Sequence, residues 1–260
     1  MDIKLWKDEI PFLNADAETP NFMTSFFIDT DKPLPCVVVL PGGGYCRRVR
    51  HEAEPIAEFF NSCGFHAVIV EYRVSPNRFP SGLADVQRAI KILRYNAEKW
   101  QIDPKRIVVC GFSAGGHIAA SSILYPEVYS SKGDAIDEMS HLPNGAILCY
   151  PVISLDSEFG HVGSGVSLLG DKYGEEKLEH SAERRVSDKT PPVFMFHTSD
   201  DNTVNVKNSL AFASALRDSG IPFELHVFPL GKHGVGLANE YTDLGKWKHL
   251  ASEWINKNIK

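Results

Sequence analysis

Short runs of β-branched and aromatic residues alternate along the chain with longer stretches whose apolar positions recur every three or four residues. The short runs predict strands, and several are apolar at every position, as expected of strands that helices cover on both faces. The predicted strands are residues 36–40, 66–72, 106–110, 146–150, 193–197 and 223–228. Strands that alternate with helices predict a parallel sheet with crossover helices.

The longer stretches predict helices with one buried face. In residues 82–100 the apolar side chains recur at helical spacing, at Val86, Ile90, Leu93, Ala97 and Trp100. Residues 51–62 are soon followed by a glycine, which is typical of a helix end. The last helix has one apolar side, made of Leu244, Trp247, Ala251 and Trp254.

Nothing in the 260 residues divides the chain, because there is no internal repeat, low-complexity tract or linker. We therefore predict one α/β domain over residues 1–260, with a mostly parallel sheet of about eight strands and helices on both faces. Residues 21–28 predict an outer strand, in an antiparallel hairpin with residues 3–6. Residues 156–190, rich in glycine, serine and charge, predict a small excursion with short helices over the top of the sheet.

The strongest chemical signal is the segment RIVVCGFSAGGHIAA, in which a predicted strand runs into the motif GFSAG and an apolar helix follows. A G-x-S-x-G motif in this context places a serine, here Ser113, on a strained strand-to-helix turn. The turn exposes the hydroxyl above the carboxyl end of the sheet and aims the helix N-terminus at it. We interpret Ser113 as a nucleophile. The alternative is a glycine-rich turn in which this serine only caps the helix.

A serine hydroxyl is a poor nucleophile until a base accepts its proton. In this architecture the acid, and then the base, follow the nucleophile along the chain. HTSDDNTV and GKHGVGL each follow a predicted strand and leave the sheet at the same end as the serine. We therefore predict His233 as the general base, although such a histidine considered alone is more often an exposed loop residue.

Two adjacent carboxylates compete for the role of orienting the histidine. We choose Asp201, because it begins an Asp-x-x-Val pattern with Val204. Asp200 remains the alternative acid, and is otherwise expected to be a turn residue that satisfies local backbone N–H groups. The acid would hold the histidine in one tautomer and stabilise its charged form.

The segment LPGGGYCRR follows the predicted strand CVVVL, and its glycines allow backbone N–H groups to turn inward, as an oxyanion hole requires. We predict the N–H groups of Gly43, Gly44 and Ala114 as the donors. A phosphate-binding loop is disfavoured, because the spacing fits neither G-x-G-x-x-G nor G-x-x-x-x-G-K-[ST]. Tyr45, directly after the glycines, is expected either to line the acyl or alcohol pocket or to be an ordinary surface tyrosine.

Composition narrows the possible partners. Hydrophobic residues make up 43% and charged residues 23%, as in ordinary soluble proteins, and the formal net charge is −6. No basic cluster is longer than Arg47-Arg48, so nucleic acid and anionic membranes are poor candidate partners. The N-terminus lacks a signal-peptide pattern and no run could span a bilayer, so we expect a cytoplasmic location. Edge strands and outer helices would allow a homodimer, although no patch is diagnostic of one.

The cysteines and histidines give no sign of a metal. The five cysteines are odd in number and include no CxxC pair, which argues against a disulfide framework or a cysteine-based zinc site. His226 and His233 have no recognisable zinc spacing, and His117 is expected to pack or hydrogen-bond behind the nucleophile. We expect no metal and no other cofactor.

Together these motifs resemble the α/β-hydrolase superfamily. Within it, the chain is similar to esterases related to hormone-sensitive lipase and to the bacterial acetyl-xylan esterase-like hydrolases. The resemblance covers nearly the whole chain, through PGGGY, IDPKRIVVCGFSAGGH, TPPVFMFHTSDDNTV and ELHVFPLGKHGVGLA. It implies the α/β-hydrolase fold, and it implies triad and oxyanion roles for the residues predicted above.

Two residues depart from the family pattern. Pro41 stands where lipase-type relatives carry histidine before the glycines, which moves the likeness toward the acetyl esterases. Asn205 follows Val204 where the family often has proline, a change that affects loop rigidity more than chemistry. The long N-terminal cap of the lipase-type relatives has no counterpart here. An open, shallow site is implied, suited to a short acyl group on a bulky polar alcohol.

The resemblance thus implies a serine carboxylesterase for short acyl esters, with acetyl groups on sugars or xylo-oligosaccharides as the expected substrates. A peptidase related to prolyl oligopeptidase shares this architecture, but no propeller precedes the core and no acidic pair for binding an amine is recognisable. A non-catalytic ligand receptor on a hydrolase scaffold usually lacks one triad member, whereas all three candidates are present here. These two functions are kept as alternatives.

Overall fold

The computed structural model describes residues 1–7, 9–14, 20–156 and 158–260. Outside this part lie residues 8, 15 and 16, which belong to the N-terminal segment without a signal-peptide pattern. Residue 157 of the predicted excursion lies outside it as well. No helix in the described ranges combines the length and the hydropathy that crossing a bilayer would require.

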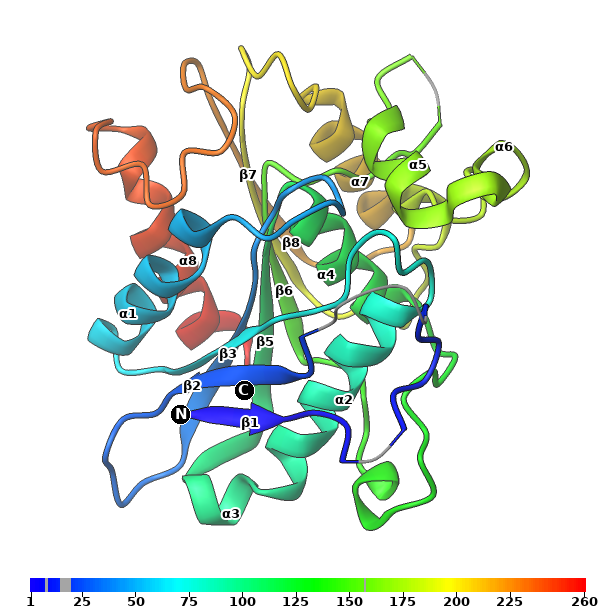
Figure 1. Cartoon of the computed structure of the whole chain (residues 1–260). Coiled ribbons are helices and arrows are strands. Elements are labelled where there is room, and N and C mark those ends of the chain that lie inside the picture. The colour runs from blue at the N-terminus through cyan, green and yellow to red at the C-terminus, as the bar shows by residue number, and fades with distance from the viewer. Residues whose placement is uncertain (8, 15–19, 157) are drawn as a thin grey trace.

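One eight-stranded sheet runs through the molecule, in the order β1-β2-β4-β3-β5-β6-β7-β8 (Figure 1). Its strands are β1 (Asp2–Lys4), β2 (Phe22–Phe26), β3 (Leu34–Leu40), β4 (His66–Val70), β5 (Ile102–Phe112), β6 (Gly145–Cys149), β7 (Val193–Thr198) and β8 (Phe223–Phe228). The pairs β1–β2 and β2–β4 are antiparallel, and all later pairs are parallel. The predicted fold class is confirmed, including the antiparallel hairpin at the start of the chain.

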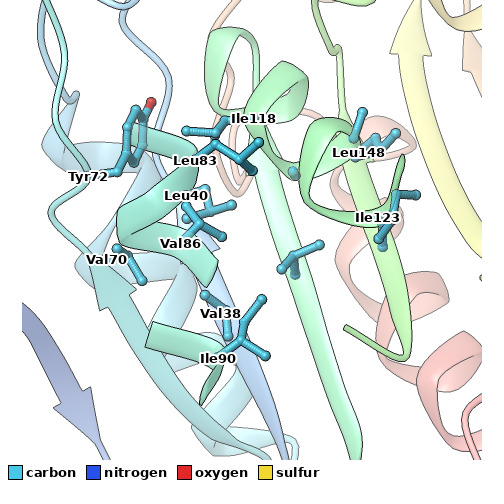
Figure 2. Packing of buried hydrophobic residues seen from close by; sticks show 14 of the residues in the cluster. Val38, Leu40, Val70, Tyr72, Leu83, Val86, Ile90, Ile118, Ile123 and Leu148 are labelled. Carbon is cyan, nitrogen blue, oxygen red and sulfur yellow. The ribbon is translucent and has the colours of Figure 1, made fainter. Parts of the chain in front are cut away.

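Helices cover both faces of the sheet. One face carries α2 (Ser81–Tyr95), α4 (Ala114–Leu124) and α7 (Lys207–Asp218), and the other carries α1 (Glu54–Ser62) and α8 (Trp247–Asn258). Val38 of β3 packs in the first core with Val86 of α2, as Figure 2 shows. Its neighbour Val37 packs in the second core, which also contains Trp247. Because both faces are buried there, β3, β6 and residues 107–112 of β5 carry no polar side chains.

Two predicted helices are shorter than expected. The segment 82–100 forms two helices, α2 and α3 (Ala97–Trp100), which are separated at Asn96. The carbonyl oxygen of Ile92 accepts both the Asn96 side chain at 2.9 Å and the Asn96 backbone N–H at 3.1 Å. The segment 51–62 likewise begins with a 3₁₀ turn, η1 (Arg50–Glu52), before α1.

Short helices fill the connection between β6 and β7. They are α5 (Val162–Leu169), η3 (Gly170–Lys172), α6 (Tyr173–Glu176) and η4 (Ala182–Arg184). Figure 1 shows α5 and α6 at the same end of the sheet as the long loop that follows β8. The remaining 3₁₀ turns, η2 (Ala135–Glu138) and η5 (Leu244–Lys246), precede β6 and α8. This arrangement places the excursion beside the loops that carry the candidate chemistry.

Candidate active site

The serine turn lies between β5 and α4. β5 ends at Phe112 and α4 begins at Ala114, which leaves Ser113 between them with φ 54° and ψ −119°. Residues other than glycine rarely adopt a positive φ, and strain of this kind gathers at functional sites. A Cβ on Gly115 would lie 2.1 Å from the carbonyl oxygen of Leu40. Only glycine therefore allows α4 to approach β3 this closely.

Loops after β7 and β8 bring a carboxylate and an imidazole to this serine. His233 Nε2 lies 2.8 Å from Ser113 Oγ, and His233 Nδ1 lies 2.6 Å from Asp201 Oδ2. Because the carboxylate can only accept, His233 donates from Nδ1, and its Nε2 accepts the serine proton. The structure thus joins the three predicted residues by two hydrogen bonds, in the order that activation of a serine requires.

Asp201 is buried and receives several hydrogen bonds. Its Oδ1 accepts the N–H groups of Thr203 and Val204 at 2.8 and 2.9 Å. His197 Nε2 lies 3.4 Å from its Oδ2. Burial alone would raise the pKa of this carboxyl, but hydrogen bonds from His197, from His233 and from the Val204 N–H hold the pKa well below its usual range. Asp201 is therefore ionised at neutral pH.

The neighbouring carboxylate has a different partner. Asp200 Oδ1 accepts the N–H of Gly231 at 2.9 Å, two residues before His233. The structure thus places Asp201, and not Asp200, against the imidazole. The expectation that Asp200 satisfies local backbone groups was wrong, because its partner lies 31 residues further along the chain. Asp200 instead hydrogen-bonds to the loop that carries His233.

The glycine loop after β3 reaches the same place. Gly43 and Gly44 line a cavity of about 370 Å³ together with Ser113. Gly43 has φ 134°, and a Cβ there would lie 2.3 Å from the Arg47 carbonyl oxygen, so the loop requires glycine at this position. Among the described residues, the N–H groups of Gly43, Gly44 and Ala114 donate to no acceptor. The assignment of these three N–H groups to an oxyanion hole stays a prediction.

Polar side chains complete the wall of the cavity. They belong to Arg47, His51, Glu52, His161 and Thr203. Sequence reasoning gave none of these side chains a role at the site, although Arg47 lies in LPGGGYCRR and Thr203 in HTSDDNTV. His161 comes from the excursion and Glu52 from the turn before α1, and only the folded chain brings them to Ser113.

Comparison with known proteins places this geometry within a family. Residues 28–138 match the family model BD-FAE. The acetyl ester-xyloside bifunctional hydrolase of Caldicellulosiruptor lactoaceticus is 42% identical and superposes with a TM-score of 0.93, over 99% of this chain and 96% of that chain. The chain belongs to the α/β-hydrolase esterases.

Two curated relatives of the esterase are longer proteins. This chain is 38% identical over 226 residues to endo-1,4-beta-xylanase B of Butyrivibrio fibrisolvens. It is 32% identical over 224 residues to the acetylxylan esterase of Xylanibacter ruminicola. The matches cover 85% and 81% of this chain, but 35% and 44% of those relatives. The esterase therefore spans less than half the length of either protein.

The prediction of Tyr45 as an ordinary surface tyrosine was wrong, while its predicted place beside the substrate stays a prediction. Its side chain is 2% exposed and packs against Tyr72, outside the cavity wall that the structure describes around Ser113. The Tyr45 hydroxyl lies 2.8 Å from His117 Nδ1, and His117 Nε2 lies 2.8 Å from the His180 carbonyl oxygen. His117 thus forms hydrogen bonds behind the nucleophile, as expected, and Tyr45 supports it from the core.

Proposed function

We propose that the esterase hydrolyses short-chain acyl esters through an acyl-enzyme formed on Ser113. The observation that carries this proposal is the pair of contacts at His233, 2.8 Å to the serine oxygen and 2.6 Å to Asp201, beside an open cavity. In this role Asp201 holds the imidazole in one tautomer and stabilises its charged form, without taking the proton itself.

The reaction proceeds in two halves. Ser113 Oγ attacks the ester carbonyl carbon while His233 accepts the hydroxyl proton. The carbonyl oxygen gains negative charge and receives hydrogen bonds from the N–H groups of Gly43, Gly44 and Ala114. His233 then donates its proton to the alcohol oxygen as the C–O bond breaks. Water attacks the acyl-enzyme with His233 again as base, which releases the carboxylic acid and the free serine.

We extend the proposal to acetyl groups on sugars or xylo-oligosaccharides. Two of the similar proteins are named as an acetylxylan esterase and an acetyl ester-xyloside hydrolase. The cavity beside Ser113 measures about 370 Å³, and its wall contains arginine, histidine and threonine side chains. Such a wall favours a short acyl group on a polar alcohol over a long fatty chain.

A series of acyl esters tests the proposal. We expect higher kcat/KM for p-nitrophenyl acetate and for acetylated xylose than for butyrate and longer esters. Ser113→Ala should lower kcat about a million-fold and abolish labelling by a fluorophosphonate probe. Dipeptide nitroanilides serve as the negative control, because their cleavage would indicate a peptidase. Wild-type turnover by Ser113→Ala would contradict the serine mechanism, and a preference for long chains would contradict the proposed substrates.

A further inference from the structure

His161 brings a hydrogen-bond donor from the excursion to the cavity. It stands at the start of α5, and its ring forms part of the wall beside Ser113. Its Nδ1 accepts the N–H of Ser164 at 3.1 Å and lies 2.8 Å from the Ser164 hydroxyl oxygen. A neutral imidazole that accepts at Nδ1 carries its proton on Nε2. The helix cap therefore determines the tautomer and leaves the Nε2–H as the remaining donor of His161.

This donor has no acceptor within the part of the chain that the structure describes. Desolvation, and then the charge of nearby His233, lower the pKa of His161. The ring is therefore uncharged at neutral pH and keeps its Nε2–H. Arg47, in the segment after the glycines, lines the same cavity, and its guanidinium also has no partner among the described side chains. Two unpaired donors thus reach the cavity from different loops.

We propose that His161 and Arg47 bind the leaving alcohol and select alcohols that carry several hydroxyl groups, such as a pentose. The inference rests on the proposed ester hydrolysis and extends it to the part of the substrate that departs. Hydroxyl oxygens of a sugar can accept hydrogen bonds from both side chains. An alkyl or aryl alcohol would cover the same donors without pairing them, which is unfavourable.

The test compares two acetate esters with different alcohols, acetylated xylose and p-nitrophenyl acetate. His161→Asn is the most informative variant, because asparagine caps a helix well and can still accept the Ser164 N–H, while the donor at Nε2 is lost. We expect kcat/KM for acetylated xylose to fall about tenfold more than kcat/KM for p-nitrophenyl acetate. Arg47→Gln, at an exposed position, is the second variant and should change the ratio in the same direction.

The matched control is His226→Asn, since His226 lies on β8 and its Nε2 contacts Glu224 at 2.7 Å. This variant should keep the ratio of the two kcat/KM values within twofold of the wild-type ratio. Equal losses on both esters in His161→Asn and Arg47→Gln would overturn the alcohol subsite. Absence of acetate hydrolysis in the wild-type protein would instead overturn the proposed function, so the two failures are distinguishable.

A second inference comes from a buried carboxylate that sequence reasoning missed. Glu52 is 2% exposed, and its Oε2 accepts the N–H of Gly42 at 2.8 Å. Its Oε1 accepts the hydroxyl of Tyr150 at 2.7 Å, and the same hydroxyl accepts the N–H of Gly236 at 3.0 Å. One carboxylate therefore connects the glycine loop after β3 to the loop after β8 that carries His233.

Two further contacts bring this connection close to the imidazole. The Tyr150 ring meets the His233 ring edge to face, with centroids 5.0 Å apart. A Cβ on Gly234 would lie 3.8 Å from Glu52 Oε1, so the carboxylate lies beneath the residue that follows His233. We infer that Glu52 is a positioning residue, which sets the spacing between the proposed oxyanion donors and the imidazole.

Substitutions at both ends of the connection test this role. Glutamine offers one acceptor oxygen where glutamate offers two, so Glu52→Gln can satisfy only one of the two donors. We expect kcat to fall about tenfold to a hundredfold with KM within threefold, because small displacements weaken transition-state contacts more than ground-state binding. Tyr150→Phe keeps the ring and should reduce kcat less. The double variant should lose less than the product of the single losses.

The rate of serine labelling distinguishes a positioning role of Glu52 from a purely structural one, because a change in stability alone would not alter this rate. The rate of serine labelling by a fluorophosphonate should fall in parallel with kcat in both variants, because labelling uses the same nucleophile and oxyanion donors. A lower unfolding temperature with unchanged kcat per labelled active site would overturn the inference. If Glu52→Gln does not fold, Tyr150→Phe alone provides the same two measurements.

Discussion

The two sides of the cavity are held in different ways. On one side, Ser113 directly follows β5 and Asp201 lies three residues after β7. They are 9% and 6% exposed, and they belong to one chain of hydrogen bonds with His233. On the other side, Arg47 and His161 stand on connections and keep unpaired donors within the described part of the chain. The sheet therefore positions the reacting groups, while the groups that would contact the alcohol can change without disturbing the core.

Among these substitutions, replacement of the proposed acid, Asp201, should cause the largest loss of kcat. Asp201→Asn replaces an acceptor of the Nδ1 proton with an amide, which no longer holds the histidine in its working tautomer, and kcat should fall about 10⁴-fold. Asp200→Asn is the matched control and should stay within tenfold of wild type, because Asp200 contacts only the Gly231 N–H in this loop. Steady-state kinetics with p-nitrophenyl acetate measures both. Equal losses would reverse the assignment of the acid.

Alanine substitutions at the adjacent Gly43 and Gly44 should have different effects on the proposed oxyanion hole. Gly43→Ala places a Cβ 2.3 Å from a backbone carbonyl oxygen. A Cβ on Gly44 has no atom within 4 Å, so the only strain there comes from the backbone φ of 66°. Losing one oxyanion donor costs about 10²- to 10³-fold in kcat, and we expect a loss of this size for Gly43→Ala. Gly44→Ala should lose less than about tenfold. Similar losses in the two variants would contradict a loop shaped by Gly43.

The pH dependence of the free energy of unfolding tests the hydrogen bonds around Asp201. Despite burial, hydrogen bonds keep the pKa of Asp201 below that of an unfolded aspartate, about 3.9. A depressed pKa in the folded state stabilises the protein fully above the unfolded value, and this stabilisation is lost as the pH falls through the folded value. The difference in urea unfolding free energy between wild type and Asp201→Asn should stay constant from pH 7 to 5 and shrink below about pH 4. A difference that shrinks already between pH 7 and 5 would refute this explanation.

Tyr45→Phe should have the smallest effect, because Tyr45 lies behind both sides of the cavity. Loss of its hydrogen bond to His117 should cost about 1 kcal/mol and lower Tm by about 2–4 °C. Because the described cavity wall does not include this side chain, kcat/KM should stay within twofold. Differential scanning fluorimetry and steady-state kinetics measure the two quantities. A large increase in KM would restore Tyr45 as a substrate contact.

The accuracy of the fold prediction depended on how local its signals were. The strand predicted over residues 223–228 has the same bounds as β8, since its alternation of apolar and polar residues specifies a strand locally. The helix predicted over residues 82–100 is divided at Asn96, although its apolar spacing continues through Ala97 and Trp100. Periodicity records which face is buried, but it does not record where the helical backbone is interrupted.

What the sequence by itself determined is the identity of Ser113, His233 and Asp201 as candidates, and the parallel sheet that brings them together. Their motifs describe local backbone geometry at the ends of strands, and that geometry is encoded in neighbouring residues. Tertiary structure alone decided the partners of Asp200, Tyr45 and Glu52, and the place of His161 in the cavity wall. The bond between Glu52 and Tyr150, for example, joins residues 98 positions apart. Such a contact depends on how separate elements pack, and no local pattern records it.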